Sequence, residues 1–159
     1  MEYVVSACLA GIPCRYDGGC SPFSPVMQLV DAGQALPVCP EQLGGLPTPR
    51  IPAEIQKGRV INRAGTDVTD CYVRGAAKAL GLALEQGCTK AVLKARSPSC
   101  GPGKIYDGTF CKCLTDGDGL FARALLDAGF IVDTEETFEQ QIAGDKRKKA
   151  SQTEENGHR

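Results

Sequence analysis

Short apolar runs rich in β-branched residues alternate along this chain with longer segments in which the apolar residues have helical spacing. Four runs have the length and composition of buried strands: Tyr3–Ala7, Ala35–Cys39, Lys90–Ala95 and Phe130–Thr134. Helical spacing with Pro or Gly near the ends predicts four helices: Ser24–Gly33, Asp67–Gly87, Gly117–Gly129 and Glu135–Gly144. Because strands that alternate with helices are joined by crossover connections, we predict an α/β fold: a single three-layer domain with a mainly parallel sheet and helices on both faces.

Two long stretches interrupt this alternation, residues 44–64 and 97–113, and both are rich in Gly, Pro and small polar side chains. Loops of this length in a compact domain are usually functional. We therefore expect long functional loops at the carboxyl ends of the strands, where parallel sheets bind ligands. The domain is predicted to span residues 1–143. The charged segment 144–159 has no apolar periodicity and is predicted to be disordered.

The composition narrows the class of protein. With 159 residues, 42% of them hydrophobic, the chain suits one compact domain with a full core. A net charge of -1, 6% aromatic residues and no Trp give no strong indication of nucleic-acid binding, apart from a short basic cluster at Lys146–Lys149. No segment approaches the ~20 apolar residues that span a bilayer, and nothing resembles a signal peptide. We therefore expect a cytoplasmic protein without a membrane partner, and the sequence leaves the oligomeric state open.

Cysteine is the unusual feature of the composition. The chain contains nine: Cys8, Cys14, Cys20, Cys39, Cys71, Cys88, Cys100, Cys111 and Cys113. A reducing cytoplasm disfavours a disulfide framework and an odd number disfavours complete pairing, so metal binding or thiol chemistry is the better explanation. The one histidine, His158, lies in the charged tail. Catalytic Cys–His and Ser–His pairs need a positioned imidazole, so the sequence argues against both, and against zinc sites with histidine ligands.

Three cysteines lie at the ends of three different predicted strands: Cys8 follows the first, Cys39 is the last residue of the second, and Cys100 lies in the loop after the third. Because the carboxyl ends of parallel strands meet at one edge of a sheet, these thiols are expected to converge. Cys14 would complete a four-thiolate zinc site, whereas three thiolates alone suit an iron–sulfur cluster with one iron open to substrate. The chain has no C-x-x-C spacing, so spacing alone does not separate these two sites from incidental thiols.

Polar residues are predicted at the same edge of the sheet. They are Glu41, Arg50 and Glu54 after the second strand, and Ser97 and Ser99 after the third. A carboxylate beside a metal cluster can activate water as a general base, and a hydroxyl can bind substrate or relay a proton. The same residues are equally typical of a loop carboxylate and of a turn before Pro98. Cys111 and Cys113 are interpreted as partly exposed incidental thiols rather than as a redox pair.

Several segments together resemble one bacterial family, the thiouracil desulfidases, formerly labelled only as a domain of unknown function. The matching segments are VSACLAGIPCRYDGG, PVCPEQLGGLPTPRIPAEI, GTDVTDCYVRGA, LKARSPSCG, IYDGTF and, more loosely, GDGLFARALLDAGFIVDTEE. In chain order they extend from Val5 to about Glu136. The chain departs from the pattern in its charged tail and in its additional cysteines: Cys20, Cys71, Cys88, Cys111 and Cys113.

The resemblance implies a cofactor and a reaction. The cofactor would be a [4Fe-4S] cluster held by three cysteines, with one open iron for the thiocarbonyl sulfur of the substrate. Water would replace that sulfur on the ring carbon, so a thiolated pyrimidine such as 2-thiouracil would give uracil and hydrosulfide without net redox change. Carried onto this sequence, the ligands would be Cys8, Cys39 and Cys100, with Cys14 as an alternative to Cys8.

The resemblance also implies roles for polar residues. Glu41 would be the acid–base residue, and Ser97 its hydroxyl partner or a substrate contact. Further candidate substrate contacts are Arg15, Gly44, Gly45 and Ser99. Arg15 is alternatively expected to pair with Asp17 and so to hold its own loop.

Two other functions fit the same residues. One is a sulfur transferase that uses the same cluster, and the other is a non-catalytic zinc-binding module. In protein handled in air, the site is expected to be empty or filled with zinc, because an exposed iron is sensitive to oxidants.

Overall fold

Four parallel strands form the central sheet in the order β2-β1-β5-β8. The computed structural model describes residues 1–156, with side chains described as far as Ser151. The strands are β1 (Tyr3–Ser6), β2 (Ala35–Val38), β5 (Lys90–Leu93) and β8 (Ile131–Thr134). Tyr3 pairs with Ala35 on one side and with Lys90 on the other, so these strands start at one level and their carboxyl ends emerge together. Pro37 is tolerated in β2 because this strand lies at the sheet's edge.

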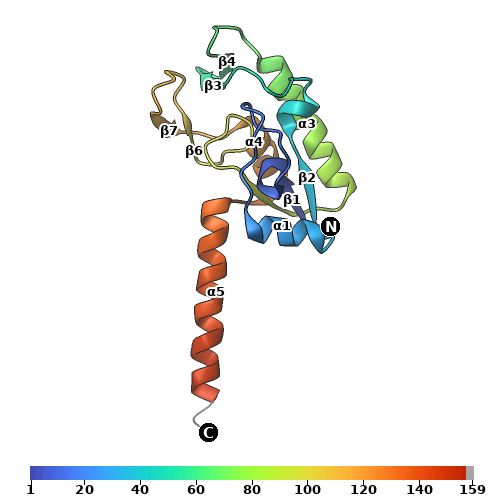
Figure 1. Ribbon diagram of the computed structural model, residues 1–159, viewed down its shortest axis with the longest axis vertical. Coiled ribbons are helices and arrows are strands. Elements are labelled where there is room, and N and C mark those ends of the chain that lie inside the picture. Colours follow the sequence, from blue (N-terminus) through green and yellow to red (C-terminus); the bar gives the residue numbers. More distant parts are fainter. Residues whose placement is uncertain (157–159) are drawn as a thin grey trace.

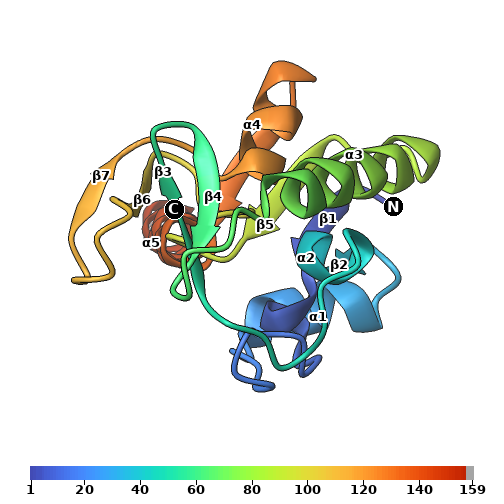
Figure 2. The same cartoon turned by 90° about the horizontal axis from the view of Figure 1, so that it is seen from above.

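Helices cover both faces of the sheet, which confirms the predicted α/β class with three layers (Figure 2). They are α1 (Ser24–Asp31), α2 (Pro40–Leu43), α3 (Thr69–Glu85), α4 (Leu120–Asp127) and α5 (Glu135–Asn156), with a 3₁₀ turn, η1 (Ala7–Ala10). Val4 packs in the core cluster with residues of α3 and α4, whereas Val5 packs in a second cluster with residues of η1 and α1. Neighbouring residues of β1 thus face opposite layers, and both are fully buried.

Two antiparallel hairpins occupy much of the two stretches that were expected to be loops. The first pairs β3 (Ala53–Gln56) with β4 (Arg59–Asn62), and the second pairs β6 (Lys104–Tyr106) with β7 (Leu114–Asp116). Figure 1 shows both at the end of the domain opposite the free end of α5. Parts of both stretches are therefore regular β-structure, and the second hairpin ends just beyond its stretch, at Asp116. The strands of the central sheet show as nearly continuous apolar runs, whereas those of the hairpins mix polar and apolar residues and become strands only through their partners.

The last helix extends beyond the point where the sequence predicts disorder. Disorder was predicted for residues 144–159, but α5 continues through Gly144 to Asn156, and residues 157–159 lie outside the described part of the chain. Figure 1 shows the helix projecting away from the domain. Residues 145–151 are all exposed, so this segment is helical because Lys, Arg and Ala favour helices rather than because it packs on a core. None of the described helices combines the length and the apolar character needed to cross a membrane.

Candidate active site

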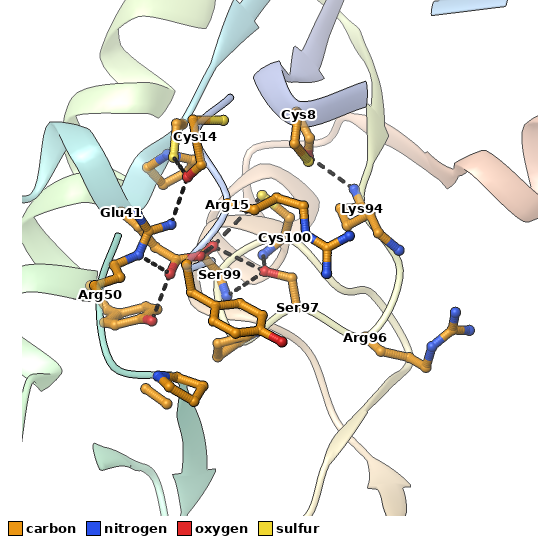
Figure 3. Close-up of a pocket in the computed structure, with 18 of the residues that line it drawn as sticks. Cys8, Cys14, Arg15, Glu41, Arg50, Lys94, Arg96, Ser97, Ser99 and Cys100 are labelled. Atoms are coloured by element: carbon orange, nitrogen blue, oxygen red, sulfur yellow. Dashed lines mark hydrogen bonds and ion pairs between the residues drawn. The ribbon is translucent and has the colours of Figure 1, made fainter. Parts of the chain in front are cut away.

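The loops that leave β1, β2 and β5 surround a pocket of about 350 Å³ at the carboxyl edge of the sheet. The two hairpins complete its wall. The lining includes Cys8, Cys14 and Arg15 after β1, Cys39 and Glu41 after β2, Ser97, Ser99 and Cys100 after β5, and Glu54, Arg63 and Phe110 from the hairpin regions. The convergence that the strand topology predicts is therefore present, and Figure 3 shows the side chains that make it.

Four thiols contribute to this wall. Cys8, Cys14 and Cys100 are buried and Cys39 is half-buried. The Cys14 thiol contacts those of both Cys8 and Cys39, so Cys14 lies beside the predicted ligands rather than apart from them. The structure thus brings both of the alternative residues, Cys8 and Cys14, into the pocket. Within the described residues, no group of three His, Cys, Asp or Glu side chains is placed to hold a single metal ion.

The surroundings keep the thiols of Cys14, Cys39 and Cys100 protonated when no metal is bound. Burial raises the pKa of Cys100 to about 12. A hydrogen bond with Cys39 lowers the pKa of Cys14, but contact with Cys8 and burial outweigh it, and the value rises to about 11. The contact with Cys14, together with burial, raises the pKa of Cys39. Because metals bind thiolates, loading this site with metal must release protons.

Glu41 is held by donors on both of its carboxylate oxygens. It lies in α2, which begins directly after Cys39. Its Oε1 accepts hydrogen bonds from Arg50 Nε at 3.0 Å and from the Tyr72 hydroxyl at 2.8 Å, and its Oε2 accepts one from Ser99 Oγ at 2.9 Å (Figure 3). The side chains of Arg50 and Glu41 are only 5% and 15% exposed, so solvent screens this ion pair weakly.

The hydroxyl that contacts Glu41 directly belongs to Ser99 rather than to Ser97. The resemblance implied Ser97 as the hydroxyl partner of Glu41 or as a substrate contact. In the structure Ser99 Oγ contacts the carboxylate, and Ser97 Oγ lies 3.1 Å from Ser99 Oγ. Ser97 Oγ also accepts the backbone N–H groups of Ser99 and Cys100, at 3.2 and 3.1 Å. The result is a continuous chain of hydrogen bonds from Glu41 through Ser99 to Ser97.

Two residues of the site have a role that the sequence did not indicate. Arg50 was expected at this edge, but the sequence did not show that it connects two loops. It donates hydrogen bonds to Glu41 and to the carbonyl oxygen of Cys14, the latter at 2.9 Å. Tyr72 lies within α3 and is only 2% exposed, so its position in the sequence is typical of a residue that packs in the core. Burial and the neighbouring Glu41 carboxylate raise its pKa, which keeps the hydroxyl protonated as a donor.

The other predicted substrate contacts are only partly in place. Arg15 lines the pocket, but it donates to Ser21 Oγ at 2.6 Å, whereas Asp17 accepts the N–H of Gly19, so the expected Arg15–Asp17 pair is not formed. Gly44 and Gly45 do not line the pocket. Gly44 packs against the backbone of α3, and Gly45 turns the chain with a φ of 93°.

Fold and pocket together define a class: α/β proteins with a thiol- and carboxylate-lined pocket at the carboxyl edge of a parallel sheet. Within that class, the family model for 2-thiouracil desulfurase matches residues 3–137. The chain belongs to the 2-thiouracil desulfurase family.

Individual proteins resemble the chain over most of its length. The protein YbbK of Bacillus subtilis (strain 168), described as uncharacterized, is 43% identical over 142 residues, which is 83% of this chain and 94% of that protein. The solved structure of the [4Fe-4S]-dependent thiouracil desulfidase TudS is 43% identical and superposes with a TM-score of 0.83. That match covers 90% of this chain and 96% of that chain. The fold is thus shared over nearly the whole chain.

Proposed function

We propose that this protein is an iron–sulfur-cluster-dependent desulfidase that converts a thiolated pyrimidine such as 2-thiouracil, with water, into uracil and hydrosulfide. The reaction is hydrolytic and has no net redox change, because oxygen replaces sulfur at the same oxidation level of the carbon. The observation that carries the proposal is the meeting of buried thiols and a half-buried, hydrogen-bonded carboxylate in one pocket. Membership of the 2-thiouracil desulfurase family and the similarity to TudS support it.

The donor set suits an iron–sulfur cluster. The pocket brings together thiols from three strand ends, and sulfur donors are the ligands that hold such clusters. Cys8, Cys39 and Cys100 would hold the cluster, with Cys14 as the alternative to Cys8. When bound, the cluster supplies an open iron that acts as a Lewis acid toward the thiocarbonyl sulfur. A cluster is larger than a single ion. This fits thiols that line a pocket but, among the described residues, do not come close enough together to hold one ion.

The role of Glu41 follows from the contacts of its two oxygens. Arg50 and Tyr72 occupy Oε1, so Oε2 is the atom left to exchange a proton with water or with the leaving group. Its partner there is Ser99, which in turn contacts Ser97. We assign Glu41 as the acid–base residue, and the two serines as the hydroxyls that bind substrate or pass a proton to and from it.

The test is turnover under anaerobic conditions. Protein purified and reconstituted without air should be brown, contain iron and convert 2-thiouracil into equal amounts of uracil and hydrosulfide without any sulfur acceptor. A strict requirement for an acceptor would instead support the sulfur transferase. Colourless protein that holds about one zinc and no iron after the same treatment would support the zinc-binding module.

A further inference from the structure

Three residues with unfavourable backbone conformations line the pocket. Among the described residues other than glycine, positive φ values occur at Lys57, Arg96, Phe110 and Lys112, and all of these except Lys57 are in the pocket lining. A positive φ is unfavourable for a bulky side chain, so it persists only where neighbouring groups hold the backbone, and such strain concentrates at sites that contact ligands. Phe110, with φ 58°, carries the largest wholly apolar side chain in this lining.

Groups from the other hairpin region hold the turn that carries Phe110. A single oxygen of Glu54, Oε1, accepts the backbone N–H groups of Gly108 at 3.0 Å and of Phe110 at 3.1 Å. Gln56 donates from its side chain to the carbonyl oxygen of Gly108. A Cβ at Gly108 would lie 2.3 Å from Gln56 Cγ, so glycine is required for this close contact between β3 and the turn. The backbone at Phe110 is therefore fixed from a segment more than fifty residues earlier.

The ring of Phe110 is also supported from one face. The guanidinium of Arg63 lies over it, 5.4 Å from the ring centroid. A flat ligand in the pocket would meet the remaining face or the edge of the ring, and both are favourable geometries for contact between aromatic rings. Because its backbone and one of its faces are held, the ring meets a ligand at little entropic cost.

From this arrangement we infer that Phe110 is a specificity-determining residue that packs against the planar ring of the substrate, and that Glu54 is the positioning residue that holds it there. The inference rests on the proposed function for the identity of the ring. It adds an apolar contact to the polar ones already described. The thiols and Glu41 act on the reacting C–S group, whereas Phe110 recognises the flat ring of the heterocycle.

Two variants test the inference directly. Phe110→Leu keeps an apolar side chain but removes the ring, and should raise KM for 2-thiouracil and weaken the binding of uracil, measured by calorimetry, by the same ~3- to 10-fold, with kcat within about twofold. Glu54→Ala should reproduce both shifts. It should also speed hydrogen exchange at the amides of Gly108 and Phe110, which lose their acceptor. Glu54→Gln keeps the accepting oxygen and should restore both KM and the slow exchange.

The control is Leu114→Ala, which removes an exposed apolar side chain from β7 of the same hairpin, outside the pocket lining. It should leave KM and uracil affinity unchanged. In an active wild type, unchanged KM and uracil affinity in Phe110→Leu would overturn the role of Phe110. Unchanged hydrogen exchange at Gly108 and Phe110 in Glu54→Ala would overturn the positioning role of Glu54. That measurement needs neither cluster nor substrate. Wild-type protein that releases no uracil from 2-thiouracil would overturn the proposed function instead.

Discussion

Alanine at Gly75 is expected to destabilise the protein, because α2 and α3 meet there without space for a methyl group. A Cβ at Gly75 would lie 1.8 Å from the carbonyl oxygen of Pro40, and one at Gly44 would lie 1.9 Å from the carbonyl oxygen of Cys71. Real Cβ atoms essentially never approach another atom within 3.0 Å. Both neighbours are backbone atoms, so no side chain can rotate away, and α2 would have to move by about 1 Å or more.

A matched glycine separates the steric effect from helix propensity. Gly81 lies in the same helix, is exposed, and has no atom within 4 Å of its ideal Cβ position. Gly81→Ala should therefore stabilise the protein by ~0.5–1 kcal/mol, the usual gain for alanine in a helix. Gly75→Ala has the same gain but also the overpacking penalty of ~1–3 kcal/mol. The free energies of unfolding of the two variants should differ by about that penalty.

The same displacement should reduce activity. Since α2 carries Glu41 and begins directly after Cys39, a shift of α2 moves the carboxylate away from Ser99. Misplacement of a reacting group by 1 Å lowers rates by ~10²-fold. We therefore expect Gly75→Ala to lose most of its turnover and Gly81→Ala to keep it. Urea unfolding and 2-thiouracil turnover, both at matched iron content, measure the two effects. If Gly75→Ala were as stable and as active as Gly81→Ala, the close α2–α3 contact would not exist in solution.

Three other substitutions test the assigned roles. Glu41→Gln should keep its iron and lower turnover by ~10²–10⁴, the usual loss when a general acid–base group is removed; unchanged turnover would contradict the role of Glu41. Cys100→Ser should lose the brown absorbance and the bound iron, and full iron loading would remove Cys100 from the ligand set. Tyr72→Phe keeps the ring but not the hydrogen bond to Glu41, so we expect normal iron content and a kcat lowered by ~10-fold. A normal kcat in that variant would show that Arg50 alone suffices to hold the carboxylate.

The sheet and the meeting of the cysteines were predictable because they follow from topology. Once the apolar runs are assigned to parallel strands, the residues after Ser6, Val38 and Leu93 must emerge at one edge. The approximate positions of Cys8, Cys39 and Cys100 then need no information on side chains. The structure agrees with all three, since each lines the pocket.

What could not be predicted depends on contacts between segments distant in sequence. Ser97 and Ser99 flank one proline and are equivalent in the sequence, so only the position of Glu41, 58 residues from Ser99, decides which of them touches the carboxylate. Tyr72 occupies a position with the helical spacing of a core residue, and its hydroxyl acquires a role only because α2 packs on α3. The strands of the two hairpins likewise mix polar and apolar residues, so they are recognised only through their partners.

The correction at Gly44 shows how the site is built. Gly44 was a candidate substrate contact, but the group that comes close to it is the backbone of α3 rather than the pocket. That contact brings Tyr72 within 2.8 Å of Glu41, two residues after Cys39. A predicted ligand and the proposed acid–base group therefore share one short helical segment, whose position is set by a glycine pair, Gly44 and Gly75, outside the pocket. In this fold the packing of two helices sets where this segment lies relative to Ser99 on the loop after β5, so substitutions outside the pocket should alter catalysis.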